Sequence, residues 1–81
     1  MNIKSVKIPD ITNCKTFEDI NALLLKEGVT VGSRILYNGK IIRFLQVSSF
    51  HRDNFRYQAV QEDTGTITYQ FCDNNTFELI E

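Results

Sequence analysis

Tryptophan, histidine and paired cysteines, which supply many catalytic and recognition sites, are scarce in this sequence. Its 81 residues include no tryptophan, one histidine and two cysteines, Cys14 and Cys72, without a Cys-x-x-Cys motif. A structural zinc site needs about four clustered ligands, and small secreted domains usually carry about two to four disulfides. We therefore expect both cysteines to be reduced, no bound metal, no cofactor and a cytoplasmic location.

Long apolar runs are also missing. The longest uninterrupted run, Ala22–Leu25, is far shorter than the roughly 20 residues of a membrane-spanning helix. The sequence therefore predicts no leader peptide and no membrane partner. One proline, four glycines and 42% hydrophobic residues instead indicate a folded globular chain, long enough for a single domain.

An excess of positive charge is absent as well, since the net charge is −1. The charges are nevertheless unevenly placed: residues 34–58 carry five basic residues against Asp53 alone, whereas residues 59–81 carry only acidic ones. A mixed, solvated surface is the simplest interpretation. The alternative is a basic patch for nucleic acid, formed by the cations of the middle segment. These cations are Arg34, Lys40, Arg43, Arg52 and Arg56.

The first third of the chain predicts one strand and one helix. Residues 3–8 alternate loosely and contain two lysines, which is typical of an edge strand. Thr16 has the character of a helix N-cap, with Asp19 at the third helical position, and Gly28 is placed to end the helix. We therefore expect an amphipathic helix over residues 16–27, whose apolar stripe covers the open end of a sheet rather than a second copy.

After the helix, the pattern changes to short strands separated by turn residues. The expected strands are residues 33–37, 40–48, 55–62, 66–71 and 77–80. The expected connections are a type I′ turn at Asn38-Gly39, a looser polar loop at 49–54, a turn at 63–65 with Gly65 left-handed, and a 3₁₀ turn at 73–76.

One expected strand is apolar on both faces. Ile41, Leu45 and Val47 alternate with Ile42 and Phe44, so neither set is clearly the solvent face. Such a strand is either covered on both sides or contains a β-bulge that changes which face is buried. Between these alternatives, we expect the N-terminal helix to cover the second face.

The order of strands and turns resembles the SH3-like small barrels, a group that includes KOW, Tudor and stand-alone bacterial and bacteriophage proteins. The resemblance is carried by V-G-S-R-I-L-Y-N-G-K-I-I-R-F (31–44), Y-Q-A-V-Q-E-D-T-G-T-I (57–67) and D-N-N-T-F-E-L-I-E (73–81). It implies a mainly β protein: a five-stranded SH3-like barrel over residues 29–81, with an N-terminal strand and one helix over residues 1–28 of a single domain. Without a tryptophan, recognition of proline-rich peptides is not expected.

Catalysis is not expected either. Ser49, His51 and Asp53 include the residue types of a serine-hydrolase triad, but they lie close together in one segment. The members of a triad are oriented by separate rigid elements. The sequence also lacks phosphate-binding glycine motifs and paired metal-ligating histidines. We therefore expect a protein that is not an enzyme.

Aromatic and basic residues are concentrated in residues 50–57. Such side chains are enriched at protein interfaces and also suit single-stranded nucleic acid. We therefore expect a protein–protein adaptor or inhibitor, of the bacteriophage-encoded kind, with an RNA- or single-stranded-DNA-binding barrel as the alternative. The expected partner-binding residues are Phe50, His51, Arg52, Phe55, Arg56 and Tyr57. The sequence leaves open whether Phe55 and Tyr57 face the core, and it does not determine the oligomeric state. Together with Tyr37 and Phe50, Phe55 and Tyr57 are also the candidates for a methyl-lysine cage.

Overall fold

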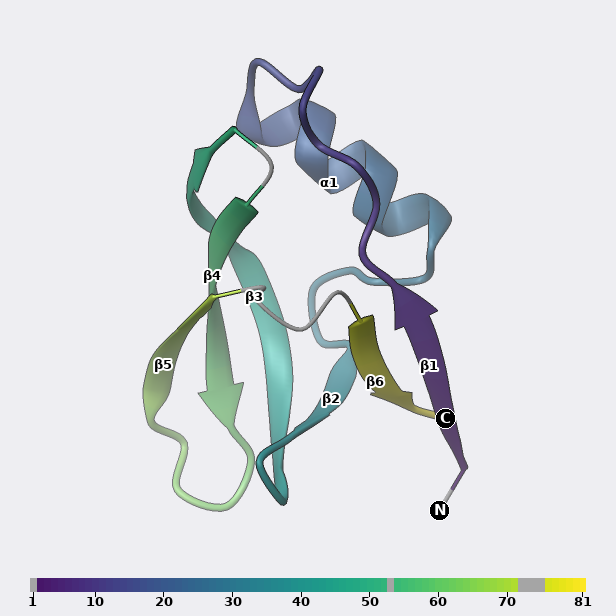
Figure 1. The fold of residues 1–81 in the computed structure, drawn as a ribbon. Coiled ribbons are helices and arrows are strands. Elements are labelled where there is room, and N and C mark those ends of the chain that lie inside the picture. Colours follow the sequence, from purple (N-terminus) through teal and green to yellow (C-terminus); the bar gives the residue numbers. More distant parts are fainter. Residues whose placement is uncertain (1, 53, 72–75) are drawn as a thin grey trace.

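The computed structural model describes residues 2–52, 54–71 and 76–81, which form one helix and six strands (Figure 1). The elements are β1 (Ile3–Lys7), α1 (Phe17–Lys26), β2 (Arg34–Tyr37), β3 (Lys40–His51), β4 (Asn54–Gln61), β5 (Ile67–Phe71) and β6 (Thr76–Ile80). The strands form one antiparallel sheet in the order β1-β6-β2-β3-β4-β5. The protein is therefore mainly β, as predicted.

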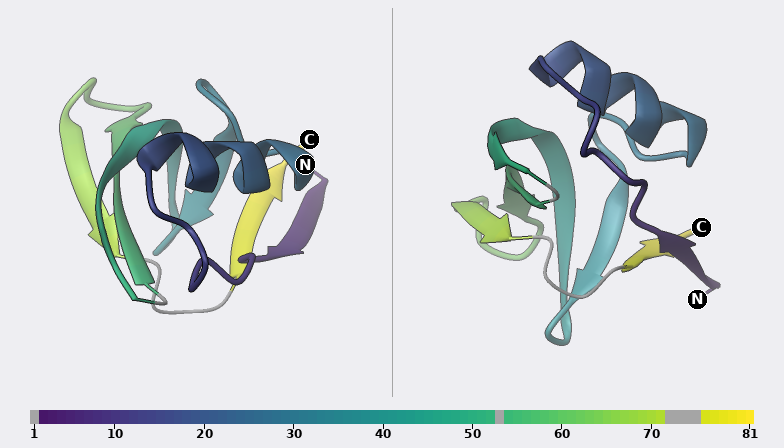
Figure 2. Two further views of the ribbon diagram at one scale, coloured as in Figure 1. Left: turned by 90° about the horizontal axis from the view of Figure 1, so that it is seen from above. Right: turned by 45° about the horizontal axis from the view of Figure 1, so that its top comes forward.

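The sheet is not closed into a barrel, which differs from the expected five-stranded cylinder. Among the described residues, β5 pairs with β4 alone and β1 pairs with β6 alone, so these two strands are the edges of the sheet. The edge position of β1 was predicted correctly. The N-terminal strand is thus the outermost strand of one open six-stranded sheet, and α1 crosses the end of the curved sheet between the two edges (Figure 2).

Helix α1 begins and ends where its sequence predicts. The Thr16 hydroxyl accepts a hydrogen bond from the Asp19 N–H at 3.1 Å, and the Asp19 carboxylate accepts one from the Thr16 N–H at 3.2 Å. At the other end, Val29 donates to the Leu24 carbonyl at 2.9 Å while Gly28 adopts φ +86°. These are the contacts of a capping box and of a Schellman motif, which satisfy backbone groups that a helix leaves unpaired at its ends.

The two tight turns with glycine also match their sequence patterns. Asn38 and Gly39 have φ values of 49° and 77°, so both central residues are left-handed as a type I′ hairpin turn requires. Gly65, with φ 72°, occupies the left-handed position of the turn between β4 and β5. Thr76 is the first residue of β6; the other residues of the expected 3₁₀ turn lie outside the described part of the chain.

A bulge, rather than a second covering layer, explains the two apolar faces of β3. The pairing of β3 with β4 shifts between Phe44 and Gln46 and again between Val47 and Ser49. Each extra residue exchanges the two faces of a strand, so Ile42, Phe44 and Val47 all reach the same core. The expectation that α1 covers a second face is therefore wrong, because α1 packs with β3 around that one core.

The hydrophobic core joins both parts of the chain. Val6, Ile11, Ile20 and Leu24 from the N-terminal segment belong to the same buried cluster as the strand residues. The strand and connecting residues of this cluster are Val29, Ile35, Ile42, Phe44, Val47, Phe55, Tyr57, Ala59, Phe77 and Leu79. A chain of this length has little apolar surface to bury, so the N-terminal segment and the later strands contribute to one shared core.

Candidate functional site

The predicted polar loop at residues 49–54 is instead the closed end of a hairpin. β3 continues to His51, β4 begins at Asn54, and these two residues pair directly. Ser49, His51 and Asn54 are exposed, so their polar side chains are compatible with strand positions at this end of the sheet. The prediction of a loop was therefore wrong, because polarity here marks solvent exposure and not irregular backbone.

The hairpin end carries a surface hollow of about 400 Å³. The described residues that line it are Ser49, Phe50, His51, Asn54, Phe55 and Arg56. This volume lies near the lower end of the roughly 300–1,000 Å³ typical of ligand pockets. Phe50, His51, Phe55 and Arg56 were predicted from the sequence, and the hairpin brings them together from two paired strands.

Phe50 forms an ordered wall of this hollow. Its ring meets the ring of Phe17 edge to face, with centroids 5.5 Å apart and planes at 81°. Phe50 is half-buried against the core, whereas Phe17, the first residue of α1, is 45% exposed. The contact ties the helix to the hairpin and leaves apolar surface beside the hollow, which suits an aromatic residue at an interface.

Phe55 and Tyr57 belong to the core and not to a contact surface. Each is 2% exposed, and the Tyr57 ring packs against Phe44 at 5.4 Å and Phe77 at 5.5 Å. Phe55 is among the residues that line the hollow but presents almost no accessible side chain. The question left open by the sequence is thereby answered: these two residues are corrected from partner-binding to structural, and a cage of Tyr37, Phe50, Phe55 and Tyr57 cannot form at the surface.

Arg52 closes the hairpin in an unusual backbone conformation. It is exposed and has φ 54°, in the left-handed region that favours Gly or Asn over a long side chain. Backbone strain of this kind is concentrated at functional positions. Together with His51, Arg52 presents an exposed basic and aromatic tip beside the hollow.

A row of polar contacts on the outer face of the sheet continues from Arg56. The Arg56 guanidinium lies over the Tyr69 ring, 5.0 Å from its centroid. The Gln58 amide donates to the Tyr69 hydroxyl at 3.0 Å, and the Gln46 amide donates to the Gln58 carbonyl oxygen at 2.9 Å. Tyr69 is half-exposed and was not among the predicted site residues. Tyr69 and Ile67 are both exposed on the same face of β5, and no sequence signal marked that face as the outer one.

The remaining candidate cations do not join this region in a single basic patch. Arg34 donates to both carboxylate oxygens of Glu62 at 3.0 Å, and Arg43 donates to one of them at 3.2 Å. The hydrogen bonds from Arg34, then those from Arg43, lower the pKa of Glu62. Lys40 is the first residue of β3, whereas Arg52 directly follows its last residue, His51. Two of the five cations therefore share one carboxylate, and the others are spread along the molecule.

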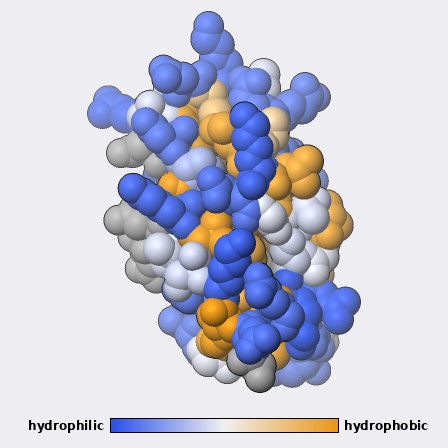
Figure 3. Space-filling model, turned by 90° about the vertical axis from the view of Figure 1, so that its right-hand side faces the viewer, coloured by the Kyte–Doolittle hydropathy of each residue, from blue (hydrophilic) through white to orange (hydrophobic). Residues whose placement is uncertain are grey.

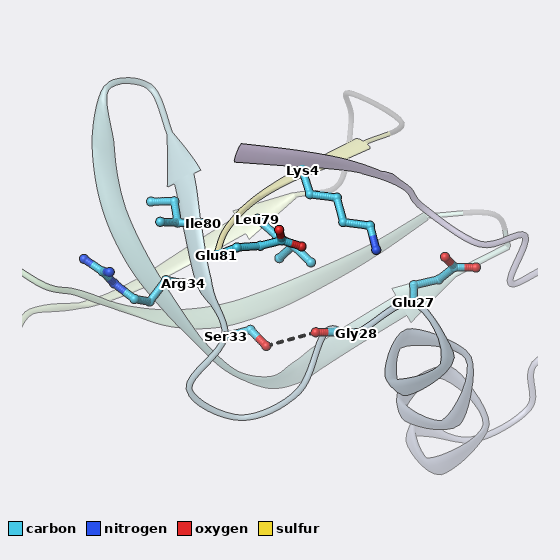
Figure 4. Close-up of a pocket in the computed structure, with 8 residues that line it drawn as sticks. All are labelled: Lys4, Glu27, Gly28, Ser33, Arg34, Leu79, Ile80 and Glu81. Carbon is cyan, nitrogen blue, oxygen red and sulfur yellow. Dashed lines mark hydrogen bonds between the residues drawn. The ribbon is translucent and has the colours of Figure 1, made fainter. Parts of the chain in front are cut away.

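A second hollow, of about 190 Å³, lies where β1, β2 and the end of β6 approach the end of α1 (Figure 4). Its lining carries charges of both signs, from Lys4 and Arg34 and from Glu27 and Glu81. The Ser33 hydroxyl donates to the Gly28 carbonyl at 3.3 Å and so holds the connection between helix and strand. Mixed charge and a structural hydrogen bond give this hollow no preference for one class of ligand.

The structure also shows where the cysteines and the other candidate metal-binding or catalytic residues lie. Within residues 2–52, 54–71 and 76–81, no three His, Cys, Asp or Glu residues are grouped as a metal ion would require. Cys14 is free, and burial, followed by the charges of Asp19 and Asp10, raises the pKa of its thiol; Cys72 lies outside the described residues. Ser49 and His51 are both exposed on β3, and Asp53 also lies outside that range.

α1 spans ten residues, and across the described segments the structure contains no helix long and apolar enough to cross a membrane. No family model, curated protein or solved structure matches this chain. The geometry of the hairpin end is therefore the basis for assigning a function.

Proposed function

We propose that this chain is a small, non-enzymatic module that binds another protein through the end of its β3–β4 hairpin and acts as an adaptor or inhibitor. We further propose that it is a variant of the SH3-like layout. In support, β2 to β5 follow one another as successive hairpins, and β6 returns to pair with β2 at Ile35↔Leu79. Such small β folds carry many unrelated activities, so the function rests on the site.

The observation that carries the proposal is the hollow at the hairpin end, bordered by exposed aromatic and basic groups. Phe50 is held in place by Phe17, and Arg56 by the ring of Tyr69. Side chains that are already ordered lose less conformational entropy when a partner binds. Aromatic and arginine residues around a hollow are also the usual composition of energetic hot spots at protein interfaces.

Nucleic acid is the less favoured partner on the same geometry. Affinity for DNA or RNA comes mainly from several cations that contact consecutive phosphates. Here Arg34 and Arg43 are engaged by Glu62, and Lys40 is remote from the hairpin end. The net charge of −1 adds no general attraction for a polyanion.

The proposal is tested with the tagged protein, a hairpin variant Phe50→Ala/Arg52→Ala, and a control Lys40→Ala at the far end of β3. Far-ultraviolet circular dichroism first establishes that all three are folded. We expect one protein from the native host to bind the original chain and the control with equal affinity. The hairpin variant should lose most of that binding, because both the apolar wall and the cationic tip are removed.

Two outcomes contradict the proposal. Equal binding of the partner by the hairpin variant would remove this surface from consideration. Capture of RNA or DNA in place of protein, with an affinity that falls steeply as salt increases and disappears after nuclease treatment, would instead support the nucleic-acid alternative.

A further inference from the structure

The outer edge of β5 has the geometry of an unfinished sheet. β5 is the last strand in the sheet order, and no described strand pairs with its outer edge (Figure 1). Its pairing with β4 runs without a register shift from Val60↔Ile67 to Arg56↔Phe71. A regular strand without bulges at a sheet edge is a template for adding another strand.

Alternate residues of β5 direct their backbone groups to this free edge. The Gln61 N–H donates to the Thr66 carbonyl at 2.8 Å, so Thr66 is turned toward β4. In an antiparallel pair the hydrogen-bonding direction alternates along the strand. Thr68 and Gln70 therefore also face β4, whereas the N–H and C=O groups of Ile67 and Tyr69 point away from it, toward the open edge.

The same two residues carry exposed apolar side chains. Ile67 is 54% exposed and Tyr69 is 50% exposed, although a strand at this position has one face on the sheet interior. Their side chains share the outer face, opposite Val60 and Gln58 of β4. Backbone hydrogen-bonding groups and apolar surface are therefore available together at one edge.

The two edges of the sheet differ in protection against strand addition. β1, the opposite edge, carries Lys4 and Lys7, and lysine at an edge opposes pairing with another strand. The side of the molecule that includes β1 is largely hydrophilic, with apolar groups in separate patches (Figure 3). Residues 64–71 contain no charged residue. Charged side chains therefore oppose strand addition at the β1 edge, and residues 64–71 at the other edge carry none.

We propose that β5 is a dimerisation strand, and that its edge pairs antiparallel with β5 of a second copy of this chain. A two-fold axis at Thr68 places Thr68 opposite its own counterpart and Ile67 opposite Tyr69 of the second copy. In this register the N–H and C=O of Ile67 each bond Tyr69 of the second copy, and the two-fold axis repeats this pair, as an isologous interface requires.

The side chains favour a second copy over an unrelated strand. Pairing a β-branched residue with an aromatic one, and threonine with threonine, are both stabilising cross-strand combinations. Because β5 has no charge, two identical strands meet without repulsion. The hairpin hollow is lined by residues of β3 and β4 and by none of β5, so the proposed dimer contact uses a different strand from the proposed partner site.

The first test is sedimentation equilibrium of the purified chain over a wide concentration range, together with amide hydrogen exchange by NMR. We expect a monomer–dimer equilibrium in which the Ile67 and Tyr69 amides become protected as concentration rises. The Thr68 and Gln70 amides should be protected at all concentrations. A chain that stays monomeric at its solubility limit, or a dimer without added protection at Ile67 and Tyr69, would overturn the proposal.

A charge-exchange experiment tests the register. We expect the variant Ile67→Lys/Tyr69→Lys to be monomeric, because like charges would lie directly opposite across the axis, and Ile67→Glu/Tyr69→Glu to be monomeric for the same reason. An equimolar mixture should form a heterodimer, since each lysine then faces a glutamate. The control Ile3→Lys, on the β1 edge, should dimerise as the original chain does. Folded variants that fail to associate when mixed would exclude this register.

Discussion

The guanidinium carbon of Arg56 lies 5.0 Å from the centre of the Tyr69 ring, across the pair formed by β4 and β5. Tyr69 also receives a hydrogen bond from Gln58 through its hydroxyl group. The contact links the hairpin hollow, which Arg56 lines, to the outer face of the edge strand. One arginine thus borders both surfaces that we propose to be functional.

We expect this stacking to be measurable as a coupling free energy. In a double-mutant cycle of Arg56→Gln and Tyr69→Leu, the effect of the double variant on the free energy of unfolding should differ from the sum of the two single effects. The expected difference is about 0.5–1 kcal/mol, the usual contribution of an exposed cation–π contact. Tyr69→Phe keeps the ring and should retain most of the coupling. Urea denaturation at low protein concentration supplies the values, and strict additivity would contradict the contact.

Phe55 should behave as a core residue although it lines the hollow. Phe55→Ala removes a ring that is 2% exposed and should lower the free energy of unfolding by about 3–5 kcal/mol. Leu25→Ala serves as the matched control, because Leu25 is 62% exposed on α1 and its loss should change stability by less than about 0.5 kcal/mol. Thermal and urea unfolding would measure both; a mild effect of Phe55→Ala would mean that the face of β4 is misassigned.

The left-handed conformation of Arg52 predicts a variant that is more stable and binds less well. Arg52→Asn should raise the free energy of unfolding by up to about 1 kcal/mol, because asparagine adopts positive φ at lower cost. Asn38→Arg, the reverse change at the other hairpin turn, where φ is 49°, should lower it by a similar amount. If Arg52→Asn is stabilising and partner affinity falls, the strain at Arg52 serves binding; a destabilised variant would refute the strain.

Stability should fall in acid through the ion pairs of Glu62. Hydrogen bonds from Arg34 and Arg43 hold its pKa below the usual value when the chain is folded, so the unfolded chain takes up a proton first. The contribution is complete at neutral pH, above the ordinary glutamate pKa of about 4, and is lost as the pH falls through the lowered pKa. Unfolding curves of Glu62→Gln should show a weaker acid dependence than those of the original chain. High salt should shrink the difference, because both pairs are partly exposed.

The capping box of α1 predicts that removing the Thr16 hydroxyl oxygen lowers the stability of the protein. Thr16→Ala leaves the Asp19 N–H without its side-chain acceptor and should lower the free energy of unfolding by about 1 kcal/mol. Thr16→Ser keeps that acceptor and should be nearly neutral. Urea denaturation of the two variants compares them directly, and equal losses would show that the methyl group, not the oxygen, matters.

Local features of the fold were predictable because neighbouring residues determine them. Thr16 and Asp19 cap the same helix that Gly28 ends, and Asn38-Gly39 closes a type I′ turn, in each case through contacts over a few positions. The strand order along the chain followed from the same signals. The prediction of a loop at residues 49–54 was wrong, because polar residues are equally compatible with a loop and with exposed strand positions.

The amino-acid sequence alone determined the mainly β class, the capped helix, the turns and the group of aromatic and basic residues at 50–57. Only the tertiary structure decided which members of that group reach the surface. Phe50 and Phe55 pair directly across β3 and β4 and therefore lie on the same face of the sheet. Phe55 is nevertheless buried beside Tyr57 and Phe77, whereas Phe50 is only half-buried, against Phe17. Two irregularities in that pairing set the register, and they arise from the fit of the whole core rather than from any local pattern.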